Sequence, residues 1–315
     1  MRRHDFVAFC LLAGALAWSA AAHAQQMIAP KVPRPVVQRQ VAPDLNFVFD
    51  YDSSNAGFLV TDEGVLAIDT RQHPRDGQDL IDRIRKITDK PIKWVVNTHF
   101  HCDHHLGNPP FKVLVATIVA QDDTAALMQK TFKKEIARRG KFFASRGYDP
   151  KEVKLVLPDV TFDHDMTIRL GGKEIRLLYL GPGQNPGDTF VLIPHDRAIY
   201  TPGAFAKRSW ANTAFTPSVE SWIKLLNQVA AMDVDYILPA HGDVATRADV
   251  AEMARFLADE YAGVKEAVAK GMSADEAVKT LTFPQYKDYR NYRVREHDIR
   301  SLYNLVKTGK SSYFD

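Results

Sequence analysis

The chain has 315 residues, of which 45% are hydrophobic and 25% are charged. That composition can supply a sizeable apolar core and predicts one large domain, or one domain with an appendage. The formal net charge of +3 is small compared with the basic excess of nucleic-acid-binding domains, so we expect no nucleic-acid partner. The two cysteines, Cys10 and Cys102, are not expected to form a disulfide, because Cys10 lies in a segment that we predict to be removed.

The first 24 residues have the layout of a secretory signal peptide. A basic start with Arg2 and Arg3 precedes an apolar run, and Ala22 and Ala24 form a small-residue cleavage site. We therefore expect a periplasmic or secreted protein with no stable membrane anchor after cleavage. A retained anchor is the alternative, since the apolar run is near the lower length limit of a membrane span. Residues 25–43 contain four prolines and no apolar period, which predicts an extended N-terminal arm.

The elements that follow alternate between short strands and helices. Strands are expected at residues 47–49, 57–61, 64–69, 92–97, 113–120, 189–193, 198–201 and 235–238, with a hairpin at 166–180. Helices are expected at residues 77–88, where apolar side chains recur at helical spacing, and at 217–232, where a proline lies in the first turn. Strands followed by helices, twice over, suit an αββα sandwich.

A further helix is predicted within residues 121–148, and it has two interpretations. Asp122 and Asp123 favour the helix dipole at its start, and an apolar stripe runs beside five basic residues. The helix either packs this stripe on the core with a solvated basic face, or forms a lid that attracts anionic substrates. Residues 263–315 predict a helical C-terminal extension that docks on the body or provides an oligomer contact.

The segment after the predicted strand at 92–97 is the most informative part of the chain. Its dense set of ligand-type residues comprises His99, His101, Asp103, His104 and His105. Imidazole nitrogens and carboxylate oxygens are ligands that zinc prefers. A strand that ends in such a loop delivers the side chains to one rim of a sheet. The pattern therefore predicts a metal site at that rim.

The spacing His99-x-His101-x-Asp103-His104 resembles the signature of the metallo-β-lactamase superfamily. Three other stretches are similar to family segments in the same order, namely residues 64–70, 181–188 and 239–242. The resemblance implies a four-layer αββα metallo-β-lactamase sandwich over residues 44–262. It does not name the substrate, because this superfamily supports many reactions on one scaffold.

The resemblance also implies two adjacent metal positions. The first would be held by His99, His101 and a later histidine, and the second by Asp103, His104 and His241. Gln184 stands where the later histidine of the first position belongs, and Ala204 stands where many members carry an Asp that bridges both metals. An amide oxygen is a weaker zinc donor than imidazole, and alanine donates nothing. We therefore expect one zinc ion at the second position, with Gln184 either a weak ligand or bonded to a backbone group.

Neighbouring residues are expected to support this site. Asp69 would orient a ligating histidine, or cap a turn, and Asp188 would hydrogen-bond within its loop. Cys102 is expected to point away from the metal and His105 to pack beside it. Trp210 and Phe215 either line the pocket or belong to the core. The remaining histidines of the predicted domain and extension are expected in loops or at the surface; they are His73, His164, His195 and His297.

The leading hypothesis is an exported zinc-dependent hydrolase that acts on a small amide, ester, lactone or lactam through water activated by the metal. Asp103 would bind the metal and orient the water, and His101 would act as a general base or oxyanion donor. The alternative is a catalytically degenerate accessory or binding protein in a periplasmic pathway, since two ligand positions are lost. Iron in place of zinc is a third possibility.

Overall fold

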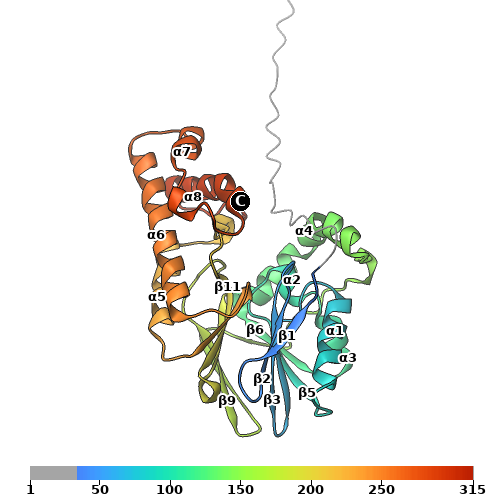
Figure 1. Ribbon diagram of the computed structural model, residues 1–315. Coiled ribbons are helices and arrows are strands. Elements are labelled where there is room, and N and C mark those ends of the chain that lie inside the picture. Colours follow the sequence, from blue (N-terminus) through green and yellow to red (C-terminus); the bar gives the residue numbers. More distant parts are fainter. Residues whose placement is uncertain (1–33, 315) are drawn as a thin grey trace, which may run out of the picture.

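Two β-sheets pack face to face, and helices cover the outer face of each sheet (Figure 1). This computed structural model describes residues 34–314, so the predicted signal peptide and the first part of the predicted arm lie outside the described residues. The first sheet has seven strands in chain order: β1 (Val37–Gln40), β2 (Leu45–Phe49), β3 (Ala56–Thr61), β4 (Gly64–Ile68), β5 (Ile92–Val96), β6 (Thr117–Gln121) and β7 (Val160–Phe162). The second sheet has the order β12-β11-β10-β9-β8, with strands β8 (Asp165–Leu170), β9 (Lys173–Tyr179), β10 (Thr189–Ile193), β11 (Ala198–Ala206) and β12 (Tyr236–His241).

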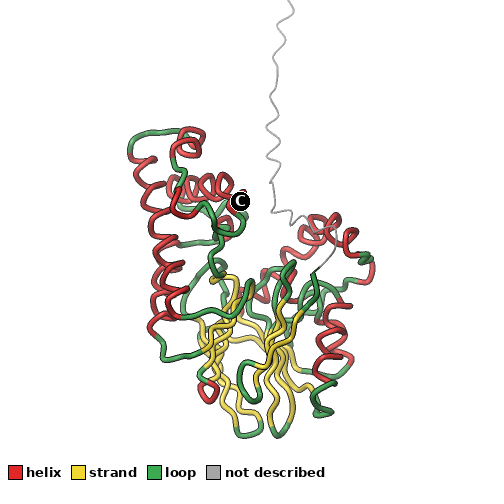
Figure 2. The backbone as a smooth tube through the Cα atoms, viewed as in Figure 1, coloured by secondary structure: helices red, strands yellow, loops and turns green. Residues whose placement is uncertain are grey.

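The helices form the two outer layers (Figure 2). Helices α1 (Pro74–Arg85) and α3 (Asn108–Val113) pack on the first sheet, and α5 (Val219–Ala231) and α6 (Arg247–Ala269) pack on the second. This four-layer arrangement confirms the expected αββα fold class.

Side chains of the central strands alternate between the two faces of each sheet, as the extended backbone requires. In β4, Leu66 and Ile68 face the second sheet, whereas Val65 and Ala67 face the helix layer of the first. All four side chains are fully buried. A strand covered on both faces explains why residues 64–68 form an uninterrupted apolar run.

Two predicted segments differ from the structure. The strand expected at residues 113–120 is wrong in its first half, because α3 extends to Val113 and β6 begins only at Thr117. Pro109 and Pro110 start α3, where their missing N–H groups break no helical hydrogen bond. In the N-terminal arm, β1 pairs antiparallel with β2, so this described part is an edge strand rather than a free tether.

The first turns of α1 pack closely against the segment that follows the predicted metal ligands. His73 lies in the loop before α1, one of the two positions expected for it, and caps the helix by accepting a hydrogen bond from the Arg75 backbone N–H at 3.2 Å, although its ring is fully buried. Gly77 of α1 lies directly against Gly107. A Cβ on Gly107 would lie 1.9 Å from the Thr70 carbonyl oxygen, so only glycine permits this approach.

The C-terminal extension is helical and docks on the body. α6 runs unbroken through residues 262 and 263, and is followed by α7 (Ala274–Thr280) and α8 (Arg295–Thr308). Ile299 and Leu302 of α8 pack with Val264 of α6 in one buried cluster. Within residues 34–314, none of the helices is both long enough and apolar enough to cross a membrane.

Candidate metal centre

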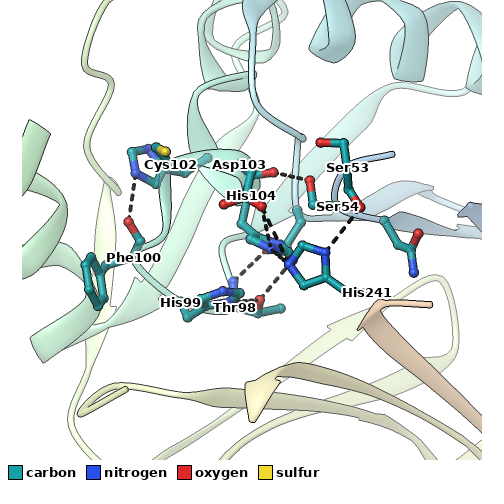
Figure 3. Close-up of polar contacts among 12 residues, drawn as sticks. Ser53, Ser54, Thr98, His99, Phe100, Cys102, Asp103, His104 and His241 are labelled. Carbon is teal, nitrogen blue, oxygen red and sulfur yellow. Dashed lines mark hydrogen bonds and ion pairs between the residues drawn. The ribbon is translucent and has the colours of Figure 1, made fainter. Parts of the chain in front are cut away.

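The ligand-rich loop and the late histidine meet at one end of the two sheets. The loop after β5 continues into the short helix α2 (Cys102–His105), and His241 is the last residue of β12. Asp103, His104 and His241 therefore come from both sheets and point toward one another (Figure 3). Their candidate ligand atoms all lie within 4.8 Å of one another.

His104 and His241 face each other through their Nε2 atoms, which are 3.2 Å apart. Their other ring nitrogens are held by acceptors. His104 Nδ1 lies 2.7 Å from Asp69 Oδ2, and His241 Nδ1 lies 3.1 Å from the carbonyl oxygen of Ser53. Because a carboxylate and a carbonyl accept hydrogen bonds, we assign the proton of each ring to Nδ1. Two Nε2 lone pairs are then directed at one place, which is the arrangement that a cation between them would satisfy.

The two carboxylate oxygens of Asp103 have different partners, the guanidinium of Arg139 and the two histidines. Oδ1 accepts a hydrogen bond from Arg139 Nη2 at 2.9 Å, and Oδ2 lies 3.5 Å from His241 Nε2 and 3.8 Å from His104 Nε2. Burial alone would raise the pKa of Asp103, but Arg139 and the neighbouring imidazoles hold it well below its ordinary value. The carboxylate is thus charged and oriented, with Oδ2 free to bind a metal.

Asp69 is the group that orients His104. Fully buried at the end of β4, it accepts hydrogen bonds from the Thr98 backbone N–H at 2.8 Å and from the Thr98 hydroxyl at 2.9 Å, in addition to the bond from His104. Burial raises the pKa of Asp69, and the bonds from Thr98 oppose that shift. The structure therefore gives Asp69 the orienting role that the sequence left open.

The imidazoles of the centre are held neutral. Burial lowers the pKa of His104 to about 3, and it places the pKa of His99 and of His101 well below the ordinary value. The pKa of His241 is also lowered by burial. Neutral imidazole is the form that binds metal, so the donor set fits a divalent cation.

The expected first metal position is only partly assembled. His99 Nε2 and His101 Nε2 are buried and have no hydrogen-bond partner among the described residues, but His101 belongs to neither cluster of close ligand atoms. Gln184 donates from its amide nitrogen to the Ala211 carbonyl at 2.7 Å, which is the backbone bond considered above. A Cβ on Gly203 would lie 2.3 Å from Gln184 Oε1 and 3.0 Å from His99 Nε2. The amide oxygen and the imidazole thus share one small space.

No carboxylate reaches this space from β11. Ala204 belongs to the apolar cluster between the second sheet and its helices, and its carbonyl accepts a hydrogen bond from Trp222 at 2.7 Å. The position on β11 whose side chain would enter the centre is Gly203. Neither residue supplies a bridging ligand.

The remaining predicted site residues hold the surrounding loops. Asp188 accepts hydrogen bonds from the backbone and the side-chain amide of Asn185, and burial raises the pKa of Asp188 to about 7. Cys102 points away from the centre and donates its thiol to Glu135 at 3.2 Å. His105 Nε2 contacts the Phe100 carbonyl at 3.1 Å. Cys102 and His105 are therefore structural, as expected.

A cavity opens beside the centre, and Arg290 is the one of its charged wall residues that sequence reasoning missed. Helix α4 (Asp122–Arg146) contributes Arg138 and Arg139, so its basic residues are partly a wall of the cavity rather than only a solvated face. Trp210 and Phe215 line the cavity although both are buried, and the Phe215 ring lies 4.4 Å from the His101 ring. The C-terminal extension contributes Arg290. The basic composition of residues 121–148 was the one available signal, whereas nothing in the local sequence marks Arg290.

Comparisons with known proteins identify the family of the chain. Residues 50–241 match the model of the family described as the metallo-beta-lactamase superfamily. The linear primary-alkylsulfatase of a Pseudomonas species is 24% identical over 285 residues, which cover 76% of this chain and 53% of that protein. The type 2 metallo-beta-lactamase of Elizabethkingia meningoseptica is 23% identical over 195 residues, covering 61% of this chain and 70% of that protein.

A solved structure shows the same fold over most of the chain. The stereoselective inverting sec-alkylsulfatase of a Pseudomonas species superimposes with a TM-score of 0.71 at 17% identity, covering 85% of this chain and 50% of that one. This chain spans about half the length of each of the two alkylsulfatases. Because the family model matches more than half of the chain and the two-sheet fold carries the histidine loop at its rim, the protein belongs to the metallo-β-lactamase superfamily.

Proposed function

We propose that this protein is a metal-dependent hydrolase with one zinc ion held by Asp103, His104 and His241. The observation that carries the proposal is the pair of Nε2 atoms 3.2 Å apart, each on a ring whose Nδ1 is held by an acceptor. Three protein ligands and an open fourth position are typical of catalytic zinc sites. The incomplete donor set around His99 supports a single firmly bound ion.

The residues around this position have distinct tasks. A bound zinc ion would supply Lewis acidity and activate water as the nucleophile. Arg139 holds Asp103 through Oδ1, which leaves Oδ2 turned toward the two histidines. His101 lines the cavity with a half-buried, neutral ring, and its Nε2, which has no hydrogen-bond partner among the described residues, would accept a proton as the general base. Phe215 packs on that ring and limits its rotation.

We propose a small ester, lactone, amide or lactam as the substrate class, and we add sulfate esters on the basis of the relatives. Two of the similar proteins are named for alkyl sulfate cleavage and one for cleavage of β-lactams. The chain spans only half of the alkylsulfatases, so their activity is not transferred as a whole. A screen should therefore include carboxylic esters, sulfate esters and lactams together.

The test is metal stoichiometry, measured on protein purified without added metal. We expect one zinc ion per chain in the wild type and none in His241→Ala. His195→Ala is the matched control, because this exposed histidine lies in the loop between β10 and β11 and should leave the zinc content unchanged. Two firmly bound ions would refute the single-metal proposal and make Gln184 a ligand. Iron in place of zinc would refute the choice of metal.

The accessory-protein alternative predicts a different outcome from the same variants. If Asp103→Ala and His241→Ala abolish ester or lactam hydrolysis while the far-ultraviolet circular dichroism is retained, the hydrolase proposal stands. If a cellular phenotype of the gene persists in both variants, the protein acts without its metal centre and the hydrolase proposal fails.

We also propose that the protein is exported to the periplasm. The proposal is supported by the basic start, apolar run and small-residue cleavage site in the first 24 residues. Mass spectrometry of the protein from a periplasmic extract should find a chain that begins at Gln25. A chain that keeps Met1 and the apolar run would refute cleavage.

A further inference from the structure

The cavity beside the metal centre carries an excess of positive charge. Its wall contains three guanidinium groups, from Arg138, Arg139 and Arg290, and one carboxylate, from Asp103. A divalent metal would add to this excess. Clefts lined by one sign of charge attract ligands of the opposite sign.

Two of the three arginines are already engaged by carboxylates of the chain. Arg138 Nη2 lies 2.7 Å from Glu135 Oε2, and Arg139 Nη2 lies 2.9 Å from Asp103 Oδ1. The Arg290 guanidinium has neither a hydrogen bond nor an ion pair within residues 34–314. Asp52 influences Arg290 from a distance, but its oxygens are taken by the backbone N–H and the guanidinium of Arg34.

The backbone of Arg290 is fixed although its side chain has no partner. Its N–H donates to the Arg208 carbonyl at 2.8 Å, and its carbonyl accepts from the Trp210 N–H at 3.0 Å. These bonds attach the loop of the C-terminal extension to the segment that follows β11. From there the side chain reaches over the end of β12, where Nη1 lies 3.3 Å from the place of a Cβ on Gly242.

Gly242 directly follows His241, so the unpaired guanidinium lies over the loop that carries a ligand of the metal centre. Arg290 is exposed, whereas the centre beneath it is buried. The side chain therefore lies at the mouth of the cavity, where an entering substrate passes before it reaches Asp103 and His104. A guanidinium offers a planar set of donors that matches a carboxylate or sulfate oxyanion.

We propose that Arg290 binds an oxyanion group of the substrate and thereby makes this site favour anionic esters or amides over neutral ones. This inference rests on the proposed hydrolase function and adds a charge requirement to it. Arg290 lies outside residues 50–241, the part of the chain that matches the superfamily model. The C-terminal extension is thus a part of the substrate site, beyond its packing against α5 and α6.

The test measures anion binding in protein treated with a chelator, so that the metal cannot contribute. Sodium sulfate and sodium acetate are titrated separately while the guanidinium signals of the arginines are followed by NMR. We expect Arg290→Gln to weaken binding of the preferred anion about tenfold, the lower end of the range for hydrogen bonds to charged groups, because the side chain is exposed. Arg290→Lys keeps the charge but loses the planar donor pair, and an intermediate affinity is expected.

Tighter binding of sulfate would identify a sulfate-type oxyanion, and tighter binding of acetate a carboxylate. Arg300→Gln is the matched control, because Arg300 is paired with Asp275 on the C-terminal helices and does not line the cavity. Equal anion affinity in the wild type and Arg290→Gln would overturn the proposal.

The zinc content is measured on the same variants, and it separates this proposal from the proposed function. Arg290→Gln should keep one zinc ion per chain. With an active substrate in hand, Arg290→Gln should raise KM for anionic esters while leaving KM for a neutral ester unchanged. If the wild type binds no zinc, the hydrolase proposal is refuted, whereas the result of the anion titration still stands.

Discussion

We expect Asp69→Asn to weaken zinc binding by about ten- to a hundredfold, because it would shift the ring proton of His104 from Nδ1 to Nε2. The fold should be retained. The carboxylate presents Oδ1 to the Thr98 N–H at 2.8 Å, while Oδ2 accepts from the Thr98 hydroxyl and from His104 Nδ1–H at 2.7 Å. An amide that keeps its oxygen on the Thr98 N–H presents its NH₂ group to His104. Nδ1 must then accept, and the ring proton moves to Nε2, the atom that would bind the metal.

The magnitude follows from this tautomer change. Removing a group that orients a metal-ligating histidine costs about ten- to a hundredfold in metal affinity, or about 1.4 to 2.7 kcal/mol. The backbone should tolerate the change, since Asp69 has φ 56° and asparagine adopts that region about as readily as aspartate. Alanine at this position would instead combine loss of the acceptor with backbone strain.

The assay is competition for zinc with a fluorescent chelator, combined with ¹⁵N NMR of the histidine rings in the metal-free protein. The variant should show a proton on His104 Nε2, and the wild type a proton on Nδ1. Asp196→Asn serves as the control, because Asp196 is another buried carboxylate that contacts Lys173 and no imidazole. Wild-type zinc affinity in Asp69→Asn, or an unchanged tautomer, would refute the reasoning.

Two further predictions concern stability. Glu260 is fully buried, neither of its oxygens has a hydrogen-bond partner in the part of the chain that the structure describes, and burial, together with the charge of Asp298, raises its pKa well above the ordinary value. The unfolded chain therefore loses its proton first as the pH rises above about 4.5, and the wild type loses stability relative to Glu260→Gln by up to about 1.4 kcal/mol for each pH unit until Glu260 ionises in the folded state. Urea unfolding over a pH series checks this, and a difference independent of pH would contradict it. For Gly107→Ala we expect a loss of about 1–3 kcal/mol or more, because the new Cβ would lie 1.9 Å from the Thr70 carbonyl oxygen. Gly140→Ala is its control, since nothing lies within 4 Å of the added carbon in the middle of α4, and a small gain in stability is expected there. Equal unfolding midpoints for both glycine variants would show that α1 and the ligand loop tolerate a wider separation.

The sequence was sufficient for the parts of the site that depend on local chemistry. Asp103 and His104 are brought close to His241 as the superfamily resemblance implied, because α2 follows the loop after β5 and His241 ends β12 at the same end of the two sheets. The αββα layers followed from the order of strands and helices. The strand prediction for residues 113–120 failed in its first half because two local signals conflicted. The two prolines at the start of α3 outweighed the β propensity of the valines after them.

The parts that could not be predicted depend on long-range docking. Arg139 lies on Asp103 only because α4 packs across α2, and the sequence of α4 fits a solvated basic face equally well. Arg290 reaches the cavity because its loop pairs with residue 209, 81 positions earlier in the chain. The burial of the His73 ring within its loop was not predicted for the same reason, since the ring stacks on Tyr148 of a distant segment.

The charges of the centre and the cavity give the two proposals a common physical basis. Gln184, Gly203 and Ala204 supply no strong ligand where a second metal would be held, so we expect one zinc ion. A centre with one zinc ion has less positive charge than a centre with two. Arg139 of α4 and Arg290 of the C-terminal extension both line this cavity with guanidinium groups. Arg139 is neutralised by Asp103, which leaves Arg290 as the charge available to a substrate. An anionic ester would therefore find its countercharge on the protein rather than on a second metal ion, and Arg290→Gln should affect anionic substrates alone.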